Sequence, residues 1–217
     1  MHNGHAHNGD APQRGGLILI RHAQTRSNAQ GSWHGSLDEG LSRLGQEEAL
    51  EAAERLRDRT DLRVSGVVSS DLRRAVETAE IMASAIGVPN VVQEPRLRER
   101  DMGKWSGRSP HEVRKRWPGM LERWIAGSIG GPPGGETDAA VARRARLALL
   151  DCCSPAPGVM LVVTHGGVIR SLRREGGLPN VPVAHLGGHV ARIECGPGTV
   201  TLGEEILLGD PAAQPIT

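Results

Sequence analysis

Short apolar runs alternate along the chain with longer segments whose apolar residues recur three or four positions apart. The run at 17–20 is continuously apolar, as expected for a strand buried on both faces of a sheet. Further runs predict strands at 64–69, 91–92 and 159–163, and a hairpin at 190–193 and 199–202. The helical periodicity predicts helices at 42–58, 70–86, 110–125, 137–150 and 166–174.

Residues with short polar side chains occupy the predicted first positions of several of these helices. A side-chain oxygen at such a position can accept a hydrogen bond from a free amide of the first turn. We therefore expect Ser42 to cap the first helix, Ser70 or Asp71 the second, and Thr137 the fourth. The Gly- and Pro-rich stretch 127–135 is predicted to be a loop and not a domain linker, because too little chain follows it for a second full unit.

Repeated strand–helix units predict a mainly parallel sheet with helices on both faces and right-handed crossovers. The C-terminal hairpin would add an antiparallel edge. The expected fold is therefore an α/β protein, a three-layer α/β/α sandwich with a mainly parallel central sheet. We expect a single domain over 17–217, preceded by a disordered tail at 1–16 that is rich in His, Asn and Gly.

The amino-acid composition makes some classes of binding partner and some kinds of site less plausible. Lys and Arg number 26 against 25 Asp and Glu, so no broad basic field favours nucleic acid or an anionic membrane. No apolar run is long enough to span a bilayer, and the N-terminus lacks the apolar segment of a signal peptide. Three cysteines suggest neither a disulfide framework nor a zinc site, so we expect reduced thiols in a cytoplasmic protein.

Polar residues gather just beyond the predicted strands. Because ligands of open α/β sheets bind beyond the carboxyl ends of the strands, these side chains should meet at one place. Arginine forks and the free amides of a helix that begins at Gly166 match the oxygens of a phosphoryl group. The set consists of Arg21 and His22, Arg73 and Arg74, Glu99, and His165.

Seven short blocks along the chain carry a more specific signal. The blocks are Arg21-His22-Ala23-Gln24-Thr25, Leu41-Ser42-Arg43-Leu44-Gly45, Ser70 to Ala79, Leu97-Arg98-Glu99, Gly103 to Gly107, Gly134-Gly135-Glu136-Thr137 and Thr164-His165-Gly166-Gly167. They resemble blocks of the histidine phosphatase superfamily, the phosphoglycerate mutase-like proteins, and within it the broad-specificity phosphatases of the glucosyl-3-phosphoglycerate phosphatase type. They occur in the family's order over roughly 17–186, which is far more specific than one short motif.

The resemblance implies a phosphomonoesterase that needs no metal and no cofactor. His22 would attack phosphorus, while Arg21, Arg74 and His165 would bind the phosphoryl oxygens. Glu99 would protonate the leaving group and then activate water. The resemblance also aligns Asn28 with a phosphate contact, and the remaining candidate substrate-binding residues are Thr25, Arg26, Trp33, Arg108 and Gly166.

Each assignment has a plainer alternative. Arg74 could be a surface arginine, although Arg73, with Glu77 four residues on, suits that role better. Glu99 could belong to a solvated charge cluster, with Asp101 as the substitute acid. The tryptophans could pack in the core and make no substrate contact.

The family pattern usually has glycine where this chain has Ala23. A methyl group there could crowd the phosphate or strain the backbone. The ligand expected is a small phosphorylated metabolite. The alternatives are phosphoglycerate mutase-type transfer, which the short stretch between Gly107 and Gly134 disfavours, and a catalytically weak sensor of a phosphorylated ligand. The hairpin edge is a candidate surface for a homodimer.

Overall fold

A computed structural model of the protein describes residues 14–28, 38–152, 157–194 and 198–210. Within them a six-stranded sheet has the order β3-β2-β4-β1-β5-β6. Strands β1 to β4 are parallel to one another, whereas β5 pairs antiparallel with both β1 and β6. The strands are β1 (Arg14–Arg21), β2 (Val64–Ser69), β3 (Val91–Gln93), β4 (Val159–Thr164), β5 (Gly187–Glu194) and β6 (Thr199–Leu207).

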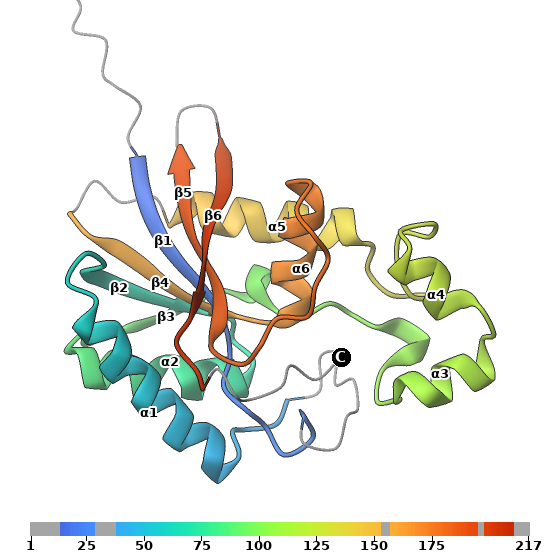
Figure 1. The fold of residues 1–217 in the computed structure, drawn as a ribbon, viewed down its shortest axis with the longest axis horizontal. Helices are drawn as coiled ribbons and strands as arrows, with labels where there is room; N and C mark the ends of the chain where they lie inside the picture. Colours follow the sequence, from blue (N-terminus) through green and yellow to red (C-terminus); the bar gives the residue numbers. More distant parts are fainter. Residues whose placement is uncertain (1–13, 29–37, 153–156, 195–197, 211–217) are drawn as a thin grey trace, which may run out of the picture.

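Helices cover both faces of this sheet, and two short helices lie to one side of it (Figure 1). Helices α1 and α2 pack together on one face, and α5 and α6 on the other. The predicted three-layer α/β/α sandwich with an antiparallel edge is therefore confirmed. The helices are α1 (Arg43–Asp58), α2 (Arg73–Ile86), α3 (Pro110–Arg116), α4 (Met120–Ile125), α5 (Asp138–Asp151) and α6 (Gly166–Glu175), with 3₁₀ turns η2 (Pro95–Leu97) and η3 (Gly103–Trp105).

The predicted helix at 110–125 is wrong in one respect, because two helices occupy that stretch. Trp117 precedes Pro118 and has a non-helical backbone with φ −132° and ψ 73°, which fits the clash that disfavours the helical conformation before proline. Gly119 then has φ 74°, a left-handed conformation that glycine adopts without strain. Together these two residues end α3 and turn the chain into α4.

The predicted cap of α2 is also wrong. The N-cap is Leu72, whose side chain makes no capping hydrogen bond. The Asp38 carboxylate instead accepts a hydrogen bond from the Arg73 amide at 2.6 Å. The caps predicted at Ser42 and Thr137 are confirmed, since each side chain accepts a first-turn amide.

Strands β1 and β5 are longer than their apolar patterns indicated. Strand β1 begins at Arg14, three residues before the predicted start, and β5 begins at Gly187. The pair Gly187-Gly188 carries no apolar signal. A Cβ at Gly188 would lie 1.8 Å from the Leu19 carbonyl oxygen, so glycine is what allows β5 to approach β1 this closely. The predicted tail lies outside the described residues except for its last three positions, which belong to β1.

Alternate residues of the central strands feed two separate cores. Ile18 and Ile20 face α1 and α2, whereas Leu17 and Leu19 face α5 and α6. A third, smaller core joins η3 to α3 and α4 around three tryptophans, and its central ring, Trp105, is fully buried. The Trp105 ring lies 5.7 Å from that of Trp124. Of the two alternatives for Trp105, the structure therefore supports packing.

We expect Gly45→Ala to lower the free energy of unfolding by about 1–3 kcal/mol, even though alanine favours helices more than glycine does. The new Cβ would lie 2.0 Å from the Gln24 carbonyl oxygen, a backbone atom that cannot rotate away. Denaturant unfolding measures the change. Gly176→Ala is the control, because its nearest contact would be an ordinary 3.5 Å. Equal stabilities of the two variants would contradict this packing.

Candidate active site

Two histidines meet at the carboxyl ends of the neighbouring strands β1 and β4. Arg21 pairs with Thr164 in the sheet register, so His22 and His165 both come directly after the paired strands. The His22 amide donates to the Thr164 carbonyl at 2.9 Å. The two rings are 5.2 Å apart between centroids and are inclined by 62°. The expected meeting of two imidazoles at one end of the sheet is therefore what the structure shows.

Hydrogen bonds to both ring nitrogens define the tautomer of His22. Its Nδ1 lies 2.7 Å from the Ala23 carbonyl oxygen, which can only accept, so Nδ1 donates. Its Nε2 accepts from Nε of Arg74 at 3.2 Å. A donor on one side and an acceptor on the other leave the ring neutral, with the lone pair on Nε2. This is the form that a nucleophilic histidine requires.

Burial and nearby cations keep both imidazoles neutral. Burial, followed by electrostatic effects of Arg74, His165 and Arg21, holds the pKa of His22 well below its usual value. Burial and the charges of Arg74 and Arg21 do the same to the pKa of His165. Protonating either ring would place another positive charge among buried guanidinium groups.

The two predicted phosphate-binding arginines are buried beside His22. Arg21 donates through one terminal nitrogen to the Val183 carbonyl at 2.7 Å, and burial lowers its pKa to about 10, so it remains charged at neutral pH. Arg74 is 2% exposed. Arg73 is exposed and pairs with Glu77 at 2.7 Å, as the helical spacing predicted. The surface alternative therefore fits Arg73 and not Arg74.

Ser70 holds the ring of His165 from the end of β2. The Ser70 hydroxyl oxygen accepts from the Leu72 amide at 3.3 Å and lies 2.9 Å from Nε2 of His165. The serine can thus donate its own proton to Nε2, which leaves the proton of His165 on Nδ1. That Nδ1 is buried and has no hydrogen-bond partner among the described residues. It is a donor suited to a phosphoryl oxygen.

Glu99 lies at the N-terminus of α6, directly beside His165. Its carboxylate accepts from the Arg100 amide at 2.6 Å and from the Gly167 amide at 3.1 Å. A Cβ at Gly167 would come within 2.1 Å of a Glu99 oxygen, so glycine there makes room for the acid. The neighbouring arginines have other acidic partners: Arg96 pairs with Glu94 and Asp151, Arg98 with Asp71, and Arg100 with Asp138.

Glu99 is consequently placed toward the histidines and not in a solvated cluster of ion pairs. Asp101, the substitute acid, is exposed and accepts from the Gly103 amide at 2.8 Å. None of the contacts described for Asp101 involves either histidine.

The predicted substrate-binding residues differ in where the structure places them. Thr25 and Asn28 are buried, and the Thr25 hydroxyl donates to the Asn28 amide oxygen at 3.0 Å, so this pair shapes the loop after His22. Gly166 opens α6 beside Arg21, with ordinary room for a Cβ. Arg26 is exposed and makes no contact that ties it to the histidines. Arg108 lies elsewhere, and Trp33 lies outside the described residues.

Arg108 in particular belongs to the small tryptophan core. Its guanidinium lies 5.8 Å from the centre of the Trp117 ring, and its Nε donates to the Lys104 carbonyl at 3.1 Å. Both partners lie in the segment formed by η3 and α3. The structure does not bring Arg108 to the histidines.

Ala23 fits the structure without strain. Among the described residues the only one other than glycine with a positive φ is Leu186, so Ala23 has an ordinary backbone conformation. Its methyl group is fully buried in the core beneath α1 and α2. Its amide donates to the Thr78 hydroxyl at 3.1 Å. The methyl group therefore points into the core and does not crowd the phosphate side.

Sequence reasoning missed two residues near the histidines. His185 lies with its ring 6.2 Å from that of His22 and donates through Nε2 to the Asn28 amide oxygen at 3.3 Å. It follows no strand, so no sequence pattern marked it. Arg170 is half-buried, and no hydrogen bond or ion pair joins it to another described residue. Nearby Glu99 partly offsets the effect of burial on the pKa of Arg170. Its position four residues after Gly166, on the same helical face, was a usable signal.

In the described ranges no three His, Cys, Asp or Glu residues are grouped so that they could hold a metal ion. No described helix combines the length and the apolar character needed to cross a bilayer.

The pKa of His185 gives a test of how this end of the sheet is packed. Burial and then the charge of Arg21 lower that pKa from 6.5 to about 3. Below pH 6.5 the unfolded chain binds a proton that the folded protein does not, so the free energy of unfolding falls as the pH falls.

His185→Gln keeps a donor for Asn28 and removes the titration. We expect this variant to lose stability less steeply than the parent between pH 6 and pH 4, by about 1.4 kcal/mol per pH unit. Urea unfolding at a series of pH values provides the slopes. An unaltered slope in His185→Gln would contradict the assignment.

Three comparisons place the chain among known proteins. A family model described as the histidine phosphatase superfamily (branch 1) matches residues 17–189. Glucosyl-3-phosphoglycerate phosphatase of Mycolicibacterium vanbaalenii is 35% identical over 202 residues, which cover 84% of this chain and 88% of that protein. Metal-independent phosphoserine phosphatase of Arabidopsis thaliana is 33% identical over 159 residues, covering 72% of this chain and 66% of that protein.

Solved structures agree with these relatives. The mycobacterial glucosyl-3-phosphoglycerate phosphatase in complex with VO3 superposes with a TM-score of 0.69 at 32% identity, over 84% of this chain and 91% of that one. The resemblance expected from the short blocks is thereby confirmed across most of the chain. The chain belongs to the histidine phosphatase superfamily and is an enzyme of the phosphatase type.

Proposed function

We propose that the protein is a metal-independent phosphomonoesterase that releases phosphate from a small phosphorylated metabolite through a phosphohistidine on His22. The observation that carries this proposal is the neutral His22, whose Nε2 lone pair lies beside a buried guanidinium. A nucleophilic nitrogen and the cations that would receive the phosphoryl group thus occupy one place.

In the first step Nε2 of His22 attacks phosphorus and the bond from phosphorus to the ester oxygen breaks. Glu99 gives its proton to the departing alkoxide. Arg21, Arg74 and Nδ1 of His165 provide fixed donors for the three phosphoryl oxygens, where charge lies in a loose transition state.

In the second step water attacks the phosphorus of phosphohistidine. Glu99, now a carboxylate, takes a proton from that water, and the bond from nitrogen to phosphorus breaks. Inorganic phosphate leaves and His22 regains its Nε2 lone pair. The arginines supply the charge stabilisation that a metal ion provides in other phosphoryl-transfer enzymes, so the scheme needs no metal.

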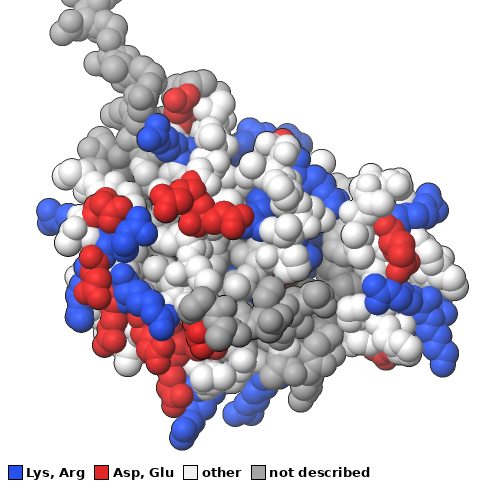
Figure 2. All heavy atoms as spheres, viewed as in Figure 1, with Lys and Arg blue, Asp and Glu red and all other residues white. Residues whose placement is uncertain are grey.

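Several features support a small metabolite as the substrate. The chain has a net charge of only +1, and Figure 2 shows basic and acidic side chains interspersed on one face with no continuous basic field. The phosphate-binding cations are instead buried. The relatives named above act, by their names, on glucosyl-3-phosphoglycerate and on phosphoserine, both of which are small phosphate monoesters.

We expect the EDTA-treated protein to release phosphate from p-nitrophenyl phosphate and from some members of a panel of sugar phosphates, phosphoglycerates, phosphoserine and nucleoside monophosphates. His22→Ala should lower kcat/KM by at least about 10³-fold, because the neighbouring imidazole, His165, has its Nε2 engaged by Ser70 and offers the phosphoryl group a donor and not a lone pair. Phosphate release and isotopic labelling of the protein measure turnover and the intermediate.

His111→Ala is the matched control, since His111 is exposed on α3. Metal-dependent release, or release that persists without His22, would contradict the proposal. Labelling of His22 that is discharged to a second phosphoglycerate but not to water would indicate a mutase.

The sensor alternative depended on Ala23, and Ala23→Gly tests it. We expect the variant to lose about 1 kcal/mol of stability, because a buried methyl group is removed and the backbone gains freedom when unfolded. Its kcat/KM should match that of the parent within about twofold. A rise of tenfold or more in turnover would show instead that the methyl group had been impairing catalysis.

A further inference from the structure

We propose that the ion pair between Glu136 and Arg144 positions the general acid Glu99, so that these two residues control protonation of the leaving group without touching substrate. This inference rests on the function proposed above. It concerns the Gly134-Gly135-Glu136-Thr137 block, which resembles a family motif and to which the mechanism assigns no role.

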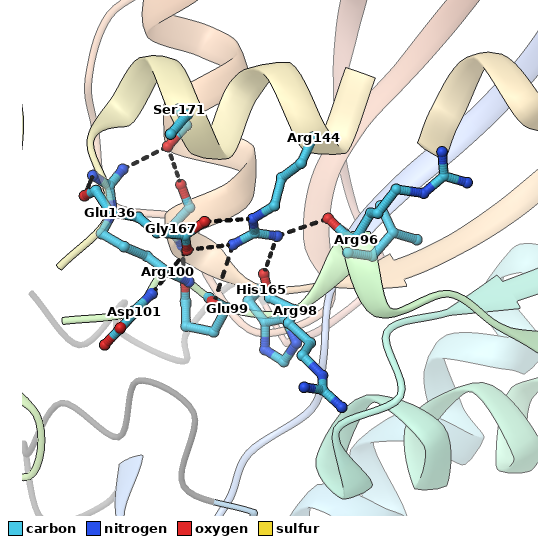
Figure 3. A network of polar contacts seen from close by, with 12 residues as sticks. Arg96, Arg98, Glu99, Arg100, Asp101, Glu136, Arg144, His165, Gly167 and Ser171 are labelled. Carbon is cyan, nitrogen blue, oxygen red and sulfur yellow. Dashed lines mark hydrogen bonds and ion pairs between the residues drawn. The ribbon is translucent and has the colours of Figure 1, made fainter. Parts of the chain in front are cut away.

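The guanidinium of Arg144, on α5, uses all three of its nitrogens. One terminal nitrogen donates to the carbonyls of Arg96 and Arg98, each at 2.7 Å. The other donates to the carbonyl of Glu99 itself at 3.2 Å. Figure 3 shows this guanidinium between the acid-bearing segment and the Glu136 carboxylate. Three hydrogen bonds from one rigid, planar group thus define the main-chain path that leads to the acid.

Glu136 fixes the guanidinium and the far side of the same segment. Its two carboxylate oxygens accept from Nε and a terminal nitrogen of Arg144, both at 2.8 Å, which is a bidentate pair. The carboxylate also accepts from the Asp101 amide at 3.0 Å, and the Glu136 amide donates to the Asp101 carbonyl at 2.9 Å. Glu99 is therefore held from both directions along the chain.

The two glycines before Glu136 make this arrangement sterically possible. Gly134 turns the chain with φ 72°. A Cβ at Gly135 would lie 2.3 Å from the Asp101 carbonyl oxygen, and a Cβ at Gly103 would lie 2.4 Å from the Gly135 amide. Two stretches of main chain therefore approach each other directly, which places the Glu136 carboxylate within reach of Arg144.

The position of Glu99 matters because its carboxylate can act only from a narrow range of positions. It must accept from the Gly167 amide while leaving an oxygen for the substrate. A shift of its main chain by about 1 Å can lower the rate about 10²-fold when proton transfer depends on that geometry. Although burial opposes ionisation, hydrogen bonds from Arg144 hold the pKa of Glu136 below its usual value, so the pair stays charged at neutral pH.

The test uses the difference between a good and a poor leaving group. p-Nitrophenolate departs without a proton, whereas the alkoxide of an alkyl phosphate needs one. We expect Glu99→Gln to lower kcat/KM about 10²-fold or more for the best alkyl phosphate of the panel, and less than about tenfold for p-nitrophenyl phosphate. Arg144→Met and Glu136→Gln should shift the ratio of the two kcat/KM values in the same direction, by at least about tenfold.

This ratio does not depend on how much of a variant is folded, because the active enzyme concentration cancels. Arg146→Met is the matched control, since Arg146 lies on the same helix but pairs with Glu175 at 3.6 Å. It should leave the ratio unchanged. Adding Arg144→Met to Glu99→Gln should change the ratio less than twofold further, because the residue that Arg144 positions is already disabled.

Equal losses for both esters in Arg144→Met, beside a selective loss in Glu99→Gln, would overturn the inference and leave the proposed function intact. Multiplicative effects in the double variant would overturn it too. Absence of turnover in the parent protein, or an unselective loss in Glu99→Gln, would remove the proposed mechanism and the inference with it.

Discussion

The chemistry that we propose depends on holding His22 neutral and buried among positive charges. A buried guanidinium attracts anions, and it also prevents a neighbouring imidazole from taking a proton. In the proposed mechanism Arg74 therefore serves two purposes, because it donates to Nε2 of His22 and would receive the phosphoryl group. The carbonyl of Ala23 completes the arrangement by accepting a hydrogen bond from Nδ1, the only protonated nitrogen of the ring. A histidine in water at neutral pH would have neither a fixed tautomer nor a fixed direction of attack.

This constraint explains why the acid is held separately. A carboxylate beside His22 would favour the imidazolium and so weaken the nucleophile. Glu99 is instead bound by the first turn of α6 and by its own following amide, next to His165. Its segment crosses the end of the sheet as irregular chain, which has no ladder of hydrogen bonds to fix it. The contacts from Arg144 and Glu136 supply that fixation from α5 and the turn before it.

The sequence was sufficient for the features that depend on local pattern. The apolar runs predicted the parallel strands, and their ends placed His22 and His165 together. Helical spacing separated Arg73, which pairs with Glu77, from the buried Arg74. Features that depend on distant chain were missed. Asp38 caps α2 from 35 residues away, and His185 reaches Asn28 across 157 residues.

The break between α3 and α4 was missed for a different reason. Pro118-Gly119 was visible in the sequence, but the helical spacing of apolar residues on either side was given more weight. Ala23 was misjudged because the direction of a single methyl group depends on the packing around it.

The surrounding fold fixes the phosphate side of the proposed site more firmly than the leaving-group side. This difference affects where substrate specificity can arise. The phosphate side rests on the central strands and on α2, and Arg21, His22, Arg74 and His165 are each at most 8% exposed. A change there would disturb both the core and the charge balance. On the proposed leaving-group side, the segment that carries Glu99 packs against the turn at Gly134 and Gly135 and continues into η3, which shares a small separate core with α3 and α4. We therefore expect differences in substrate to arise on this side more readily than among the buried cations of the phosphate side.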